Sequence, residues 1–494
     1  MQHIKKIPAG FMIIALILLI FTACSSNSDK KNQDVSGDTV SDATDTSGGG
    51  DNPSVAETTE AAPDLPPNQD FGGAEFTMLL SAWSDIDFDS EEITGEPLDD
   101  AIYNRNKKIE EKYNVKLKWY NPDEGQGDSV GNSYATYRKA VKSGDGTYDV
   151  FFGIQSASLE DTMNGYNVEY RDLPYIDLSK PWWDKGILDV CFGDKVYFAA
   201  GDITHSTLGY TTLLLFNKNL FTENGVPFPY DDVRSGAWTW DKFIGTIKNL
   251  SRDLNGDGKM SPKDDLYTIA GWQYELPYNF QTALGGNEII KDKDGYPQIN
   301  VFDQKNLDTI QDILDLFSDY GGFFNDKNYG DDRDMFMNHR LYFLDTRFFE
   351  INRYFRDMQD DFGMIPHPKA DASAPYYTQL VNSNVVTTTT VPVTNSRLEM
   401  TSILLEDLAY EGWKEITPQY KEVLLKTKLT RDNESADMFD YIWGHRTYRY
   451  GLIVYNNVLM NIISKGNKAY VSAYEKLQSK ADTEIEKTKK FFFS

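Results

Sequence analysis

Alternating hydrophobic positions at the start of the main body of the chain predict two β-strands with a helix between them. The runs "AEFTMLL" and "NVKLKWY" alternate with the two-residue period of a strand, and the segment between them repeats at helical spacing. The apolar positions are Phe76, Met78 and Leu80, then Leu98, Ile102, Ile109 and Tyr113, then Val115, Leu117 and Trp119. This order predicts a βαβ unit.

Strand and helix patterns continue along the chain. A helical run ends at the breaker "SGDG" and is followed by the apolar strand "YDVFFG". Further strand-like segments are "KVYFAAGD", "TTLLLFNKNLF", "RLYFLDT" and "FGMIPHP", whereas helical spacing prevails from Asn395 onward. The sequence therefore predicts an α/β fold with open sheets and a helical C-terminal portion.

Length and composition favour two globular lobes and exclude some partners. The chain of 494 residues exceeds one ordinary core, and 40% hydrophobic residues can fill more than one. A net charge of -27 repels a phosphate backbone, so we expect no nucleic-acid partner. The sequence has only two cysteines and no HExxH, GxSxG or Walker-type motif. We expect no redox cofactor, a small buried thiol at Cys191 and a monomeric protein.

The N-terminus has the parts of a secretory signal. Two lysines precede an apolar run that ends at Phe21, and small residues follow before Cys24. The "TAC" segment resembles a bacterial lipobox, although Phe21 stands where leucine is more usual. The resemblance implies removal of residues 1–23 and a lipid at Cys24. The alternative is an ordinary signal peptide with an incidental cysteine.

Residues 24–69 differ in composition from the rest of the chain. They contain almost no large apolar side chains and are rich in Ser, Thr, Asp, Gly and Pro, so they cannot bury enough surface to fold. We expect a disordered tether. Together with the lipid, it would hold the body at the extracellular face of the cell membrane.

The order of local phrases resembles the extracellular solute-binding proteins of ABC importers, in particular the sugar-binding family that includes maltose-binding protein. Each phrase is weak alone, and the order carries the resemblance. The phrases are "YDVFFG", "GDKVYFAAGD" with "TTLLLFNKNLF", "GAWTWDKFIGTIKNL", "ELPYNFQTALGGNEI", "LYFLDTRFFE", "FGMIPHPK" and "VPVTNSRLEMTSILLEDL".

The resemblance implies two α/β lobes, a hinge that the chain crosses more than once, and a cleft between the lobes. Matching the phrases puts lobe 1 at 70–199 and 340–388, and lobe 2 at 200–339 and 389–494, with "FAAGD" as the first hinge. The implied activity is capture of a carbohydrate, such as an oligosaccharide, and its delivery to ABC permease subunits. The alternatives are a binder of peptide or another solute, or a surface enzyme acting on polysaccharide.

A sugar cleft needs aromatic platforms and polar hydrogen-bonding groups. Trp83, Ser84 and Asp85 follow the first strand, where an open α/β sheet presents ligand groups. The other candidates are Trp183 before the hinge, Trp272, Tyr278 by family position, and Asp345 and Arg347 after the "LYFL" strand. For each Trp the alternative is a place in the core, and for Asp85 and Arg347 it is a solvated ion pair.

Two further tryptophans are expected to be structural. Trp238 and Trp240 flank Thr239, and Thr239 or Asp241 precedes a helical run as a capping residue does.

The acidic stretch "DLNGDGKMSPKDD" resembles an EF-hand-like or dockerin calcium loop. Oxygen ligands at alternate residues around a glycine turn can surround one calcium ion. The expected ligands are Asp253, Asn255, Asp257, the Lys259 carbonyl, Ser261 and Asp264. Asp at the twelfth position and Pro262 depart from the pattern, and the alternative is a surface turn rich in Asp, Asn and Gly. We expect a structural calcium ion on the second lobe.

Overall fold

The computed structural model describes residues 61–81, 88, 90–124, 131–325, 330–382, 385–426, 433–455, 458–464 and 469–494. Trp83, Ser84, Asp85 and Cys24 lie outside these described residues. Within them, no helix is both long enough and apolar enough to span a bilayer.

Two larger sheets organise the body. The first has the strand order β12-β3-β1-β2 and the second β10-β4-β9-β5-β8, and two small sheets pair β11 with β13 and β6 with β7. The strands are β1 Ala74–Leu80, β2 Val115–Tyr120, β3 Val150–Ile154, β4 Thr212–Asn217, β5 Tyr267–Trp272, β6 Ile289–Lys291, β7 Pro297–Ile299, β8 Gly322–Asn325, β9 Leu341–Arg347, β10 Phe362–Ile365, β11 Gln379–Leu380, β12 Thr387–Thr390 and β13 Arg446–Thr447.

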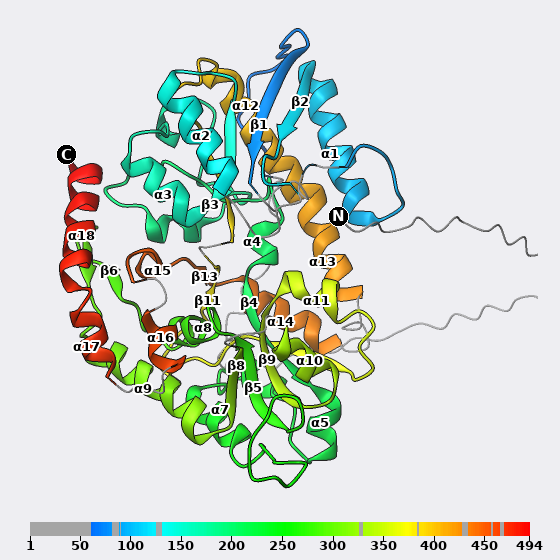
Figure 1. The fold of residues 1–494 in the computed structure, drawn as a ribbon. Coiled ribbons are helices and arrows are strands. Elements are labelled where there is room, and N and C mark those ends of the chain that lie inside the picture. The colour runs from blue at the N-terminus through cyan, green and yellow to red at the C-terminus, as the bar shows by residue number, and fades with distance from the viewer. Residues whose placement is uncertain are drawn as a thin grey trace, which may run out of the picture. The chain divides into compact units, whose positions relative to one another are not determined.

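Helices cover the sheets and make up most of the C-terminal part (Figure 1). The longer ones are α1 Pro97–Tyr113, α2 Gly131–Ser143, α3 Gln155–Met163, α7 Trp240–Ile247, α8 Leu276–Ala283, α9 Gln304–Asp319, α12 Leu398–Glu411, α13 Thr417–Lys426, α14 Asn433–Trp443 and α18 Gln478–Phe493. The shorter ones are α4 Ser206–Gly209, α5 Lys218–Glu223, α6 Tyr230–Arg234, α10 Asp331–Met337, α11 Phe348–Tyr354, α15 Gly451–Val454, α16 Val458–Ser464 and α17 Tyr470–Glu475, with the irregular helical turns η2 Tyr170–Asp172, η3 Lys185–Val190 and η4 Gly412–Ile416.

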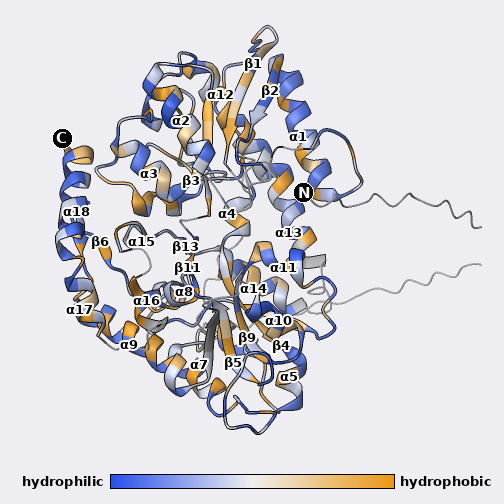
Figure 2. Cartoon of the chain, viewed as in Figure 1, coloured by the Kyte–Doolittle hydropathy of each residue, from blue (hydrophilic) through white to orange (hydrophobic). Residues whose placement is uncertain are grey.

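The first sheet confirms the βαβ prediction. β1 pairs in parallel with β2 and β3, and α1 connects β1 to β2. Phe76, Met78 and Leu80 are fully buried, as their alternation predicts, and Leu79 packs on the other face against α2. Figure 2 shows the result, with hydrophobic strands and helices such as α1 whose outer faces are polar.

The second sheet is buried on both faces. Every residue of β4 and of β9 is buried, which explains why their segments "LLLF" and "LYFL" are continuously apolar rather than alternating. β5 is parallel to both β8 and β9, whereas β4 runs antiparallel to β9 and β10.

The expected lobe boundaries are wrong in three places. β9 and β10 lie in the range expected for lobe 1, but they pair with strands of the second sheet. β12 joins the first sheet through β3 but straddles the expected boundary at 388, and α12, expected in lobe 2, packs against α1. A strand belongs to the sheet with which it exchanges backbone hydrogen bonds, and chain order does not specify that partner.

Two segments that connect the first sheet to the second lie side by side. Ala199 of the "FAAGD" segment pairs with Thr389 of β12, where the Thr389 amide donates to the Ala199 carbonyl at 2.8 Å. Further along, the Thr212 hydroxyl donates to the Leu380 carbonyl at 3.0 Å. These contacts bring both crossings to one region, which is the arrangement that a two-strand hinge requires.

Candidate functional site

The candidate site lies where β5 and β9 end. The two strands are parallel neighbours with Gly271 opposite Asp345, so their carboxyl ends meet at one edge of the sheet. Trp272 ends β5 and Arg347 ends β9. Ligands of open α/β sheets bind beyond this kind of edge.

Arg347 is a buried cation held by two carboxylates. Its Nη1 lies 3.1 Å from Glu275 Oε1 and its Nη2 lies 2.7 Å from Glu350 Oε1. The Thr346 hydroxyl donates to the other oxygen of Glu350 at 3.1 Å. The guanidinium is therefore fixed in direction, and the ion pair is a buried network rather than the solvated pair that was the alternative to ligand contact.

Glu275 is the acid of this network most affected by its surroundings. Burial raises its pKa to about 7, against the opposing effect of Arg347. Its Oε1 also accepts a hydrogen bond of 2.7 Å from the amide of Asn382, which follows β11. Glu275 can thus exist in both protonation states near neutral pH.

Aromatic rings surround the same guanidinium. The Arg347 Cζ lies 5.5 Å from the ring centre of Tyr210 and 5.8 Å from that of Trp272. Tyr274 meets Trp272 edge to face at 5.1 Å and is 40% exposed. A half-exposed aromatic pair next to a fixed Arg and carboxylates can contact both a flat apolar face and polar groups of a ligand.

Asp345 and Tyr278 lie beside this cluster but point elsewhere. Asp345 is buried, with its carboxylate 2.6 Å from His367 Nε2 and bonded to the Asn279 amide. Tyr278 is buried on α8, where its hydroxyl accepts from the Leu459 amide at 3.3 Å. Both residues support the site from within the lobe.

Four residues of the cluster are not among the candidates from the sequence: Glu275, Asn382, Glu350 and Tyr210. Glu275 stands at the start of the "ELPY" phrase that carries the resemblance, three positions before the candidate Tyr278. The phrase therefore marks the right segment, but the start of helix α8 decides whether Glu275 or Tyr278 reaches the sheet edge. Nothing local in the sequence marks the other three.

Trp182 and Trp183 both bind one buried carboxylate. Their indole nitrogens donate to the two oxygens of Glu406 on α12, at 3.0 and 2.8 Å. Trp183 is 3% exposed. It therefore lies in the packed core, which was the alternative to its predicted role in ligand binding.

The structural tryptophans and the buried thiol are as predicted. Trp238 is fully buried and donates to the Pro366 carbonyl at 3.0 Å, and Thr239 caps α7 by accepting from the Lys242 amide. Cys191 is buried, and burial raises the pKa of its thiol to about 12.

The acidic loop forms a turn whose side chains bind its own backbone. Asp253 accepts from the amides of Gly256 and Gly258 at 2.6 and 2.7 Å, and Asp257 accepts from that of Lys259. Asp265, absent from the predicted ligand set, is fully buried and accepts from Leu254 and Ser261. Both glycines have positive φ, 74° and 77°, so the turn requires them.

These carboxylates are not gathered around one point. Across the residues that the structure describes, no three His, Cys, Asp or Glu side chains are placed to hold a metal ion. Asn255, Ser261 and the Lys259 carbonyl would have to complete any coordination by Asp253, Asp257 and Asp264. Calcium binding here stays a prediction.

No protein-family model and no curated protein sequence matches the chain. Solved structures, in contrast, do match the chain. An ABC substrate-binding protein from Listeria monocytogenes in complex with cycloalternan superposes with a TM-score of 0.52 at 14% identity, covering 84% of this chain and 99% of that one.

Two further structures are similar. The GacH receptor of Streptomyces glaucescens, solved unliganded and with acarbose, has a TM-score of 0.52 at 14% identity over 84% of this chain and 99% of its own. The maltose/maltodextrin-binding domain of Bdellovibrio bacteriovorus, bound to maltotriose, has a TM-score of 0.51 at 15% identity over 83% of this chain and 100% of its own. This likeness confirms the predicted fold: the chain has the two-lobe α/β fold of these substrate-binding proteins.

Proposed function

We propose that the protein is the substrate-binding component of an ABC importer and captures a carbohydrate, such as an oligosaccharide, between its lobes. The observation that carries the proposal is the cluster of Arg347, its two carboxylates and the Trp272–Tyr274 pair at the sheet edge where this fold binds ligands. The similar proteins with this fold, in the solved structures named above, hold cycloalternan, acarbose and maltotriose.

The chemistry of the cluster suits a sugar. Tyr274 and Trp272 offer aromatic faces to the apolar side of a pyranose ring. Glu275 and Asn382 are buried and bonded to one another, so they brace the polar side of the cluster from behind. Trp83, Ser84 and Asp85, which follow β1 in the sequence, are the residues that we propose for the facing lobe. Closure of the lobes would then surround the ligand and present one closed form to the permease.

We further propose that the protein binds and releases its ligand without chemical turnover. It would be held outside the cell by a lipid on Cys24, with residues 24–69 as the tether. Mass spectrometry of the mature N-terminus checks the anchor, since a Cys24→Ser variant should lose the lipid and the membrane association.

The test of function is a thermal-shift screen of the protein against oligosaccharides, monosaccharides and peptides. A ligand that binds only the folded state raises the melting temperature by mass action, by an amount that grows with ligand concentration. We expect at least one neutral oligosaccharide to raise it, and no product to form during the incubation.

Two variants sharpen the screen. Trp272→Ala should abolish the sugar-dependent shift, whereas Tyr120→Ala, which removes a 51% exposed ring on β2, should leave it intact. A shift with peptides alone would replace sugar by peptide as the ligand. Release of shortened sugars would show an enzyme, and no shift with any sugar would reject the carbohydrate proposal.

A further inference from the structure

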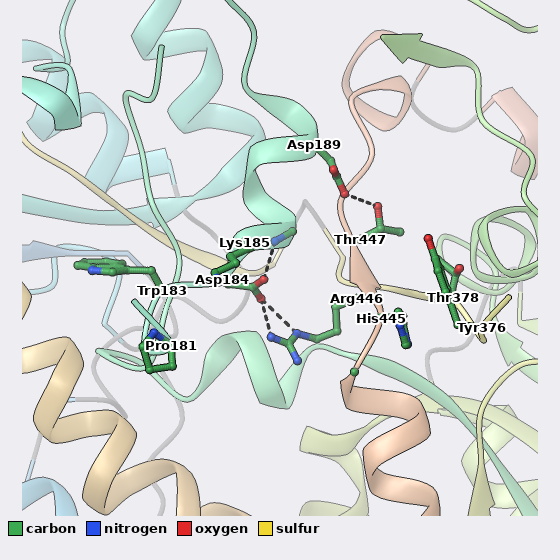
Figure 3. A pocket seen from close by; sticks show the side chains of 12 residues that line it. Pro181, Trp183, Asp184, Lys185, Asp189, Tyr376, Thr378, His445, Arg446 and Thr447 are labelled. Carbon is green, nitrogen blue, oxygen red and sulfur yellow. Dashed lines mark hydrogen bonds and ion pairs between the residues drawn. The ribbon is translucent and has the colours of Figure 1, made fainter. Parts of the chain in front are cut away.

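A separate pocket of about 540 Å³ lies between the hinge-side segment 181–189 and the small sheet β11–β13. Figure 3 shows its lining, with Asp184, Lys185 and Asp189 on one wall and Tyr376, Thr378, His445 and Thr447 on the other. Its volume is within the range of pockets that bind small molecules.

Polar contacts hold the two walls together. Asp184 Oδ2 lies 3.1 Å from Nη2 of Arg446 and accepts the Tyr448 hydroxyl at 3.1 Å. The Thr447 hydroxyl donates to Asp189 Oδ2 at 2.8 Å. The first wall is anchored by the bonds of Trp182 and Trp183 to Glu406, so the pocket is bounded by fixed groups.

One wall carries an exposed aromatic stack. The rings of Tyr376 and His445 lie 4.0 Å apart at an interplanar angle of 5°, and Tyr376 is 47% exposed. Partial desolvation lowers the pKa of His445, which favours the neutral form of its ring. The stack presents a flat aromatic surface, which suits the apolar face of a sugar ring.

The charges of the pocket balance. Arg446 is paired with Asp184, which leaves the ammonium of Lys185 and the carboxylate of Asp189 as the charged groups of the lining. One cation and one carboxylate favour neither an anion nor a cation, but together with the Thr378 hydroxyl they supply donors and acceptors. A neutral ligand with several hydroxyl groups fits this set.

The pocket is distinct from the candidate site at Arg347. Tyr376 and Thr378 precede β11, whereas Asn382, which bonds Glu275, follows it. The two places lie at opposite ends of this short strand. We propose that the pocket is a second binding site, which takes one neutral sugar unit or a polyol of similar size against Tyr376.

The experiment is calorimetric titration of the protein with glucose. In the Trp272→Ala variant, which disables the site at Arg347, we expect glucose binding to persist. Adding Tyr376→Ala should weaken that binding at least tenfold, and adding Thr378→Val should weaken it less. Tyr376 is half exposed, so circular dichroism melting should show an intact fold.

The control is Tyr120→Ala in the same background, because it removes an equally exposed tyrosine far along the chain from the pocket. It should leave glucose affinity unchanged. The proposal is overturned if glucose does not bind the Trp272→Ala protein, or if its affinity is the same with and without Tyr376. Neither result bears on oligosaccharide capture at Arg347, which the thermal-shift screen tests by itself.

Discussion

At the scale of single residues, Arg347 is the cation that stabilises two buried carboxylates. Glu275 and Glu350 reach less than a tenth of their full exposure, and each is paired with this guanidinium. An ion network of this kind offsets the cost of taking charges out of water only while every partner is present.

Replacing Arg347 should therefore be costly. We expect Arg347→Ala to lower the free energy of unfolding by about 3–5 kcal/mol, because it leaves two buried carboxylates without their cation. Urea denaturation monitored by circular dichroism measures the loss. Arg347→Met combined with Glu275→Gln should recover part of it, and a single variant as stable as the wild type would show that the network is not buried in solution.

Glu406 is another buried acid, and it makes the free energy of unfolding depend on pH. Burial raises its pKa from 4.5 to about 7 although two indoles donate to it. The folded state then holds the proton more tightly than the unfolded state, so this group's contribution to stability falls as pH rises from about 4.5 to about 7 and is constant above.

A Glu406→Gln variant cannot take up that proton. We expect the fall in unfolding free energy between these pH values to shrink by up to about 3 kcal/mol, since each unit of pKa shift corresponds to about 1.4 kcal/mol. Denaturation curves at several pH values give the slope. Glu399→Gln, on the exposed side of the same helix, is the control and should keep the wild-type slope. An unchanged slope in Glu406→Gln would mean that the acid is not buried.

At the scale of elements, the acidic loop illustrates how a motif differs from the turn that it forms. The spacing predicted a calcium loop around a glycine turn, and the glycine turn is present, because Asp and Gly at these positions favour it in any context. Asp265 lies outside the twelve-residue pattern, yet it closes the loop with both oxygens. Its burial depends on the approach of Arg252 to Leu266, which no local spacing encodes.

Two substitutions separate stability from metal binding in this loop. Asp265→Ala should lower the free energy of unfolding by about 3 kcal/mol, because two amides lose a charged acceptor. Asp257→Ala, at an exposed position, should cost less than about 1 kcal/mol but abolish the rise in melting temperature that we expect calcium to cause. Differential scanning calorimetry with and without calcium measures both the loss of stability and the calcium-dependent rise in melting temperature. Equal calcium binding by Asp257→Ala and the wild type would reject the calcium proposal, and sugar affinity should be unaffected in either variant.

At the scale of the whole molecule, the arrangement of strands into two sheets places the site. β9 lies between β4 and β5, so its last residue, Arg347, reaches Glu275 after β5 and Tyr210 before β4. Had β9 joined the first sheet, as the matched phrases implied, none of these contacts would exist. The site is thus a product of strand order.

The sequence by itself determined the classes of element, the α/β fold and several buried positions. Alternation fixed the inward face of β1, and capping chemistry fixed the start of α7, because such signals act over a few residues. Only the tertiary structure decided which carboxylates meet Arg347, which strands share a sheet and which tryptophans lie in the core. Those outcomes depend on contacts between residues far apart in the chain, whose partners are selected by packing and backbone pairing of the whole fold rather than by local pattern.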